Sequence, residues 1–141
     1  MSARPRSVRV VRQWVERAEE DLLTAEHTLT LGKRCPFPIV CFHAQQCAEK
    51  YMKALLTRHS VLFSKTHDLT ELLLLVPKEV GLEITVSDVA VLNRYAVETR
   101  YPGNWEPMTQ ADAEEAVALT RKVREAVRHH LPKEALGGHE S

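Results

Sequence analysis

Residues that could bind a phosphate gather in the segment Arg94–Trp105, which reads RYAVETRYPGNW. Arg94, Glu98 and Tyr101 recur at steps of three and four, so they would share one face of a helix, where Arg94 can pair with Glu98. Arg100 stands in the last turn before a Pro-Gly sequence that stops the helix. An arginine there either holds unpaired helix carbonyls or offers its guanidinium to a phosphate, with Tyr101 as a stacking surface. The sequence leaves both interpretations open.

A second polar group follows one ridge of the helical segment that ends near His59. Its members are His43, Gln46, Lys50 and Lys53. Such a ridge either presents donors to a phosphate or another subunit, or is an ordinary solvated helix face. Next to it, Glu49 and Lys53 are four residues apart, which predicts an ion pair on the outer face of the helix.

Two further acidic positions have a structural and a functional interpretation. His67-Asp68 is either a titratable dyad or the start of a short helix that Asp68 caps. Asp21 lies beside the apolar stripe of the first helix, where it either makes hydrogen bonds inside a bundle or helps to line a cleft.

Several kinds of site are not indicated by the sequence. It contains no GxGxxG, P-loop or HExxH motif, and its three cysteines, Cys35, Cys41 and Cys47, are six residues apart, unlike CxxC. We interpret them as buried thiols. The adjacent His129 and His130 would lie on different faces of a helix. We therefore expect no metal and no cofactor.

Composition narrows the class of protein. The chain has 141 residues, 44% of them hydrophobic, so it can form one domain with a sizeable core. Its 19 basic and 19 acidic side chains balance, so nucleic-acid affinity must come from local clusters such as Arg4–Arg12 and Arg121–Lys133. The longest apolar run, Leu72–Val76, is too short to cross a membrane. The odd cysteine count favours reduced thiols, and we expect a cytoplasmic protein.

The elements that would position these residues are helices. Apolar residues at steps of three and four predict a helix over 8–30 and a second one that ends near His59. A short third helix should follow Thr66 or Asp68 and end at Pro77. Ser87 is the predicted cap of a fourth helix, and Thr109 that of a fifth.

The fold prediction is an all-α antiparallel bundle of four main helices plus a shorter one. Leu82–Val86 alternates like a strand but has no partner, so we expect a loop that packs Leu82, Ile84 and Val86 onto the helices. The single domain would span 8–131, with flexible termini at 1–7 and 132–141.

The chain resembles the HEPN family of small prokaryotic proteins from Trp14 to about Leu131. The resemblance is carried by W-x3-A-x2-DL-x2-A from Trp14, FHAQQCAEKYMKALL from Phe42, THDL from Thr66 and TRYPG from Thr99. The second motif is the most specific, and the order and spacing of the others reinforce it.

The resemblance implies a helical bundle that forms a homodimer and is often encoded with a small nucleotidyltransferase as a toxin–antitoxin pair. Many HEPN proteins are metal-independent ribonucleases, whose motif places an arginine and a histidine at the dimer cleft. There the arginine would bind the scissile phosphate and the histidine would assist attack by the 2′-hydroxyl.

This sequence departs from that motif. Neither Arg94 nor Arg100 is followed by a histidine within four to six residues. The usual location therefore offers no imidazole as general base. A histidine from elsewhere, such as His43 or His67, could reach the cleft through folding.

The leading hypothesis is a HEPN-like dimer that binds a nucleotide or RNA phosphate at its cleft and acts with a nucleotidyltransferase partner. The residues that could bind this phosphate are Arg94, Arg100, Tyr101, Lys50, Lys53, His43 and His67. One alternative is a metal-independent endoribonuclease toxin with a displaced histidine. The other is an adaptor whose Gln45, Gln46 and Arg100 build a protein interface.

Overall fold

The fold consists of helices throughout the described part of the chain. The computed structural model describes the backbone of residues 5–100 and 107–137 and the side chains of residues 7–95 and 107–137. The long helices are α1 (Pro5–Leu29), α2 (Phe37–Arg58), α4 (Val86–Arg100) and α5 (Gln110–Arg128), and α3 (Leu69–Leu75) is the short one. The predicted all-α bundle of four main helices plus a shorter one is confirmed.

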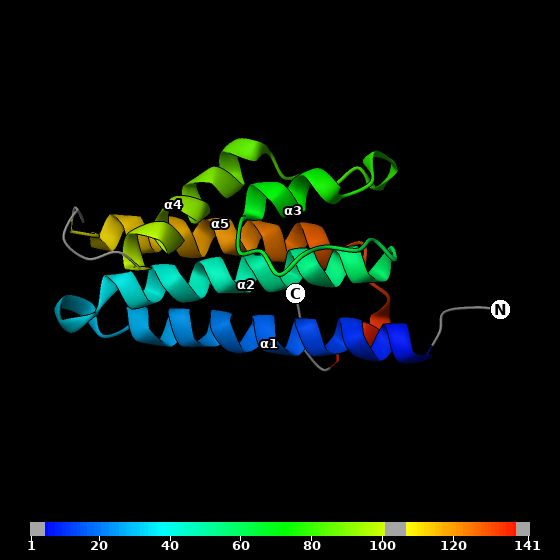
Figure 1. Cartoon of the computed structure of the whole chain (residues 1–141). Helices are drawn as coiled ribbons and strands as arrows, with labels where there is room; N and C mark the ends of the chain where they lie inside the picture. Colours follow the sequence, from blue (N-terminus) through cyan, green and yellow to red (C-terminus); the bar gives the residue numbers. More distant parts are fainter. Residues whose placement is uncertain (1–4, 101–106, 138–141) are drawn as a thin grey trace.

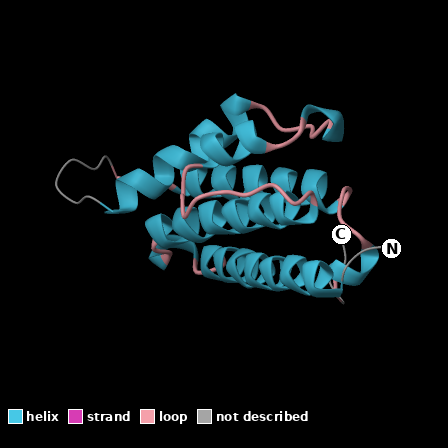
Figure 2. Cartoon of the chain, turned by 45° about the vertical axis from the view of Figure 1, so that its right-hand side comes forward, coloured by secondary structure: helices cyan, strands magenta, loops and turns pink. Residues whose placement is uncertain are grey.

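Helix α2 lies at the centre of the molecule. It contacts all four other helices. Figure 1 shows α1 antiparallel to it on one side, α5 beside it, and α3 and α4 over the opposite side. Residues 59–68, which connect α2 to α3, run back along α2 (Figure 2). Residues 40–57 of α2 are all buried or half-buried. Several polar side chains of α2, among them Gln45, Glu49 and Lys53, are therefore buried along with its apolar ones.

One polar cluster joins α1, α2 and α5 inside the bundle. Tyr51 of α2 donates a hydrogen bond to Glu19 of α1. Arg124 of α5 reaches the same carboxylate with its Nε 2.6 Å away, and Arg128 donates to the Tyr51 hydroxyl over 3.2 Å. Burial alone would raise the pKa of Glu19, but the hydrogen bonds from Arg124 and Tyr51 and the two arginine charges lower it below its ordinary value.

Local signals place most helix ends where the sequence indicates. Asp68 caps α3 by accepting from the backbone N–H of Thr70 and Glu71. Thr109 and Asp112 form a capping box at the start of α5. The expected cap at Ser87 is wrong, because Thr85 and Asp88 exchange side-chain-to-backbone hydrogen bonds at the start of α4.

Three segments differ from the expectation in detail. In the loop before α4, Ile84 is buried as predicted, but Val86 is 51% exposed and belongs to the helix. Helix α1 begins at Pro5, because proline suits a first turn. After α5, a helical turn at Lys133–Ala135 packs on α1 and buries Ala135, so packed structure continues past residue 131.

The three cysteines are buried free thiols, as the spacing indicated. Burial raises the pKa of Cys47 to about 12, so this side chain stays a neutral thiol and packs like a small apolar residue.

Replacement of Glu19 by glutamine should destabilise the fold. At neutral pH we expect Glu19→Gln to lower the free energy of unfolding by about 2 kcal/mol, because Arg124 loses its nearest carboxylate partner. Since folding lowers the pKa of Glu19, the loss should shrink as the pH falls below the ordinary glutamate pKa of about 4.3 and through the lowered one. Urea unfolding followed by circular dichroism at several pH values measures both effects.

The control is Glu125→Gln. Its carboxylate is 62% exposed and 3.9 Å from Arg124, so we expect a change under about 0.5 kcal/mol. Equal stability of Glu19→Gln and the parent chain at neutral pH would contradict the structural role of this cluster.

Candidate functional site

The carboxylate of Asp21 on α1 bridges two residues of α2. Its side chain is 11% exposed and accepts from His43 Nδ1 over 2.8 Å and from Lys50 Nζ over 2.5 Å. His43 and Lys50 are seven residues apart, so they lie on one face of α2, two turns from each other. Both keep part of their surface open, with side-chain exposures of 27% and 23%.

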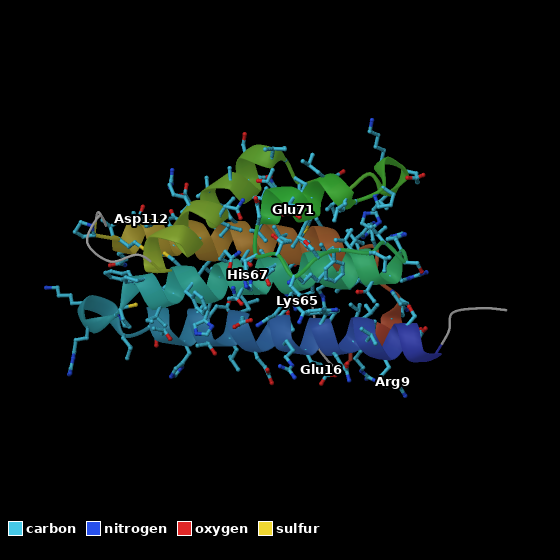
Figure 3. The ribbon with its side chains drawn as sticks, viewed as in Figure 1. Arg9, Glu16, Lys65, His67, Glu71 and Asp112 are labelled. Carbon is cyan, nitrogen blue, oxygen red and sulfur yellow. The ribbon has the colours of Figure 1, made fainter. Side chains whose placement is uncertain are left out.

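A second carboxylate, Glu49, repeats this arrangement with the loop before α3. Glu49 is 4% exposed and accepts from Lys53 Nζ over 3.0 Å and from His67 Nδ1 over 2.9 Å. The His67 imidazole is 52% exposed. Figure 3 labels His67 and Lys65 on the loop that crosses over α2.

The predicted Glu49–Lys53 pair forms, but its expected place on the outer face is wrong. Lys53 Nζ lies 5.6 Å from the ring centroid of Trp14 and 5.8 Å from that of Phe63. These rings, from α1 and the loop after α2, cover the lysine, whose side chain is 8% exposed. A cation buried here is stabilised by the carboxylate and by the two ring faces.

The two histidines share one chemical property. A carboxylate can only accept, so each imidazole must present a proton on Nδ1. When the ring is neutral, Nε2 is then the unprotonated nitrogen that can accept a proton. This is the orientation that a general base needs.

Helix α4 connects to the same loop through Asn93. The amide of Asn93 donates to Asp68 Oδ1 and Thr70 Oγ1, and its oxygen accepts from Leu69 N. From the other side, Gln45 of α2 donates to the His67 carbonyl over 3.0 Å. Hydrogen bonds made by Asn93, the residue before Arg94, thus hold α4 against the turn that follows His67.

The predicted arginine site is only partly described. Arg94 is exposed, and its guanidinium carbon lies 5.6 Å from the ring centroid of Tyr95. Tyr95 in turn donates to Glu115 of α5. Arg100 is the last residue of α4, but the side chains of Glu98 and Arg100 and the whole of Tyr101 lie outside the described part of the chain.

The predicted ridge on α2 is thus not a solvated face. The structure joins His43 to Lys50 through Asp21, and Lys53 to His67 through Glu49, and Gln46 donates to Gln45. Asp21 is a bonded carboxylate inside the bundle. Sequence reasoning missed Asn93, although its position beside Arg94 was a signal.

The expected basic surface at 121–133 is largely neutralised. Arg121 pairs with Glu26 and Lys122 with Asp88, while Arg124 points inward to Glu19. Because these three cations face carboxylates and Arg128 is buried against the Tyr51 hydroxyl, α5 provides less net positive charge for a polyanion than its sequence suggests.

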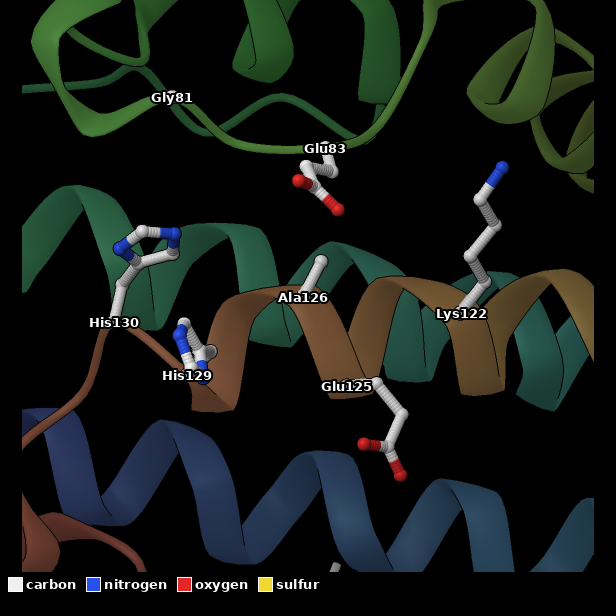
Figure 4. Close-up of a pocket in the computed structure, with 7 residues that line it drawn as sticks. All are labelled: Gly81, Glu83, Lys122, Glu125, Ala126, His129 and His130. Carbon is white, nitrogen blue, oxygen red and sulfur yellow. The ribbon is translucent and has the colours of Figure 1, made fainter.

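A hollow of about 660 Å³ in the described part of the chain lies elsewhere, and none of the predicted phosphate-binding residues lines it. It is lined by Gly81, Glu83, Lys122, Glu125, Ala126, His129 and His130. Figure 4 shows Glu83 reaching toward α5 from the segment before α4. The lining of this hollow mixes acidic and basic side chains, and Lys122 is already bonded to Asp88, so the hollow offers little net charge to an anion.

The described residues form neither a metal site nor a membrane-spanning helix. No group of three or more His, Cys, Asp or Glu there is arranged to hold a metal ion. No helix in that part of the chain is long and apolar enough to cross a membrane.

Comparison with known proteins finds relatives over nearly the whole chain. The family model described as HEPN domain matches residues 11–130. A protein of Methanocaldococcus jannaschii named "Putative toxin MJ1304" is 29% identical over 147 residues, which cover 93% of each chain.

Two solved structures are also similar. One is TT1696 from Thermus thermophilus, with a TM-score of 0.74 and 31% identity over 86% of this chain and 98% of that one. The other is ST0689, described as an archaeal HEPN homologue, with a TM-score of 0.68 and 26% identity over the same shares.

The tautomers of the two histidines provide a direct test of the site geometry. At about pH 9, where an ordinary histidine is neutral, we expect His43 and His67 to carry their proton on Nδ1. Long-range ¹⁵N–¹H correlation spectra distinguish this form from the Nε2-protonated one. In Asp21→Ala, His43 should lose the preference, because its acceptor is gone, while His67 should keep it and serve as the internal control. An Nε2-protonated His43 in the parent chain would refute the Asp21 contact.

Proposed function

The chain belongs to the HEPN family, and we propose that it is a toxin-like HEPN module that binds the phosphate of a nucleotide or RNA. The binding site would be a cleft between two copies, formed near Arg94, Arg100 and Tyr101 with Lys50 on the neighbouring helix. The toxin-like role is supported by the relative named as a toxin. A nucleotidyltransferase is the expected partner protein, because the family resemblance implies one.

The observation that carries this proposal is the position of Arg94. It is exposed, and its predicted partner, the Glu98 side chain, lies outside the described residues. The contact with Tyr95 orients its planar guanidinium. Such a fork is well suited to two oxygens of one phosphate. The Asn93 amide fixes this part of α4 to the turn at His67, so the arginine is presented from a rigid support.

Replacement of Arg94 tests the phosphate site. Fluorescence anisotropy with a labelled single-stranded RNA should show binding that weakens steeply with salt, because phosphate contacts release counterions. Arg94→Ala should reduce the affinity for RNA about tenfold. It should also reduce the slope of log K against log salt concentration by about one, because one phosphate contact is lost. The matched control is Lys78→Ala, an exposed cation in the turn after α3. Equal losses in both variants, or no RNA binding by the parent chain, would contradict the proposal.

The two carboxylate-held histidines favour a second candidate function, metal-independent RNA cleavage. An imidazole with Nε2 free could take the proton of the ribose 2′-hydroxyl as its oxygen attacks the phosphorus. The P–O5′ bond would break, leaving a 2′,3′-cyclic phosphate and, after proton transfer to the leaving oxygen, a 5′-hydroxyl. His43 and His67 would replace the histidine that is absent after Arg94 and Arg100.

Incubation of the chain with single-stranded RNA in the presence of EDTA tests this candidate. We expect cleavage to 2′,3′-cyclic phosphate ends, lost by at least about 100-fold in His43→Ala or His67→Ala. His27→Ala, an exposed histidine on α1, is the control and should cleave normally. If the RNA binds but stays intact, the result supports phosphate binding and contradicts the proposed ribonuclease activity.

A further inference from the structure

A small hollow on α1 combines groups that fit a nucleotide. It has a volume of about 280 Å³ and is lined by Val10, Gln13, Trp14, Arg17 and Lys50. It therefore offers an apolar side chain, an aromatic ring, an amide and two cations. This size is close to the lower end of small-molecule pockets and suits one base better than a long ligand.

The aromatic wall of the hollow is held in place from behind. The Trp14 ring lies 6.4 Å from the Phe63 ring, centroid to centroid, and 5.6 Å from Lys53 Nζ. Lys53 is itself fixed by Glu49. An indole that is anchored this way and still borders an open hollow is a rigid surface on which a base can stack.

The two cations differ in how far they are neutralised. Lys50 is bonded to Asp21, which His43 also engages. Arg17 lies one turn before Asp21 on α1 and is exposed, and it forms no ion pair with any described residue. Because His43 and Lys50 occupy Asp21, the Arg17 charge remains available to an anion.

Neighbouring hollows lack this combination. One on the same helix is lined by four glutamates, Glu16, Glu19, Glu20 and Glu26, with two leucines. Another contains Arg121, but Glu26 already neutralises it. Of these three hollows in the described part of the chain, the one at Trp14 pairs a ring with an uncompensated guanidinium.

We propose that the hollow at Trp14 binds one nucleotide unit, its base against the indole and its phosphate on Arg17 with Lys50 beside it. The unit is either a free nucleoside monophosphate or part of single-stranded RNA. This site shares its ligand class and Lys50 of α2 with the proposed function, but it uses Trp14 and Arg17 of α1 in place of Arg94.

Quenching of Trp14 fluorescence tests the site. In the full chain with Trp105→Phe, Trp14 is the remaining tryptophan. The probes are 5′-AMP, adenosine, ribose 5-phosphate and a twelve-residue oligoadenylate, at about 0.1 M salt. We expect 5′-AMP to quench the indole and to bind more tightly than adenosine or ribose 5-phosphate, because it alone has both base and phosphate. Calorimetry on the chain with both tryptophans checks that the substitution does not create or remove the site.

The decisive variant is Arg17→Ala, which should weaken 5′-AMP about tenfold and leave adenosine unchanged. Its control is Arg34→Ala, an exposed arginine in the turn between α1 and α2, which should behave like the parent. Quenching by the oligoadenylate but not by 5′-AMP would assign the ligand to an RNA chain. Quenching by both probes would show that the site also binds a free nucleotide.

Failure of this site and failure of the proposed function give different results. RNA that binds in an Arg94-dependent way without quenching Trp14, and equally in Arg17→Ala, would overturn the inference alone. Arg17-dependent quenching by 5′-AMP with RNA binding that ignores Arg94 would support it and contradict the cleft at Arg94.

Discussion

The structure depends on pairing the charges of the central helix α2, most of which is buried. Helix α2 contacts all four other helices, and yet it carries Glu49, Lys50 and Lys53. Charged groups removed from water are costly unless they are paired and hydrogen-bonded. Here Glu49 holds Lys53 from its own helix, and Asp21 of α1 holds Lys50. The ion pair between Asp21 of α1 and Lys50 of α2 therefore helps to fix the axial position of one helix relative to the other.

The same pairing orients the groups that could do chemistry. Each carboxylate has a second oxygen, and a histidine occupies it: His43 at Asp21 and His67 at Glu49. The contact fixes both ring and tautomer, as a carboxylate does for a catalytic imidazole. The carboxylates that neutralise the lysines of α2 thus also orient two partly exposed imidazoles, His43 and His67. Whether they bind phosphate or move protons, their placement follows from the burial of α2.

The fold could be predicted because it depends on local patterns. Stripes of apolar residues at steps of three and four require amphipathic helices that pack together, and proline, Asp68 and Thr109 mark their ends. The misplaced cap at Ser87 had a local cause as well, since Thr85 three residues before Asp88 makes the better reciprocal pair. The HEPN motifs likewise combine helix-packing positions with a few polar ones, so they identify the family from short segments.

The site depended on tertiary structure in a way that spacing cannot show. By itself, the sequence determined the helices, their approximate ends and the residue types along each face. Only the packed structure decided that Glu49 and Lys53 lie inside, because Trp14 and Phe63 come from other segments to cover them. It also decided that Asp21 meets His43 and Lys50, which are 22 and 29 residues away in the chain. Helical periodicity shows which residues share a face, but the partner of that face is chosen by packing between helices, which balances apolar burial against the cost of unpaired charge.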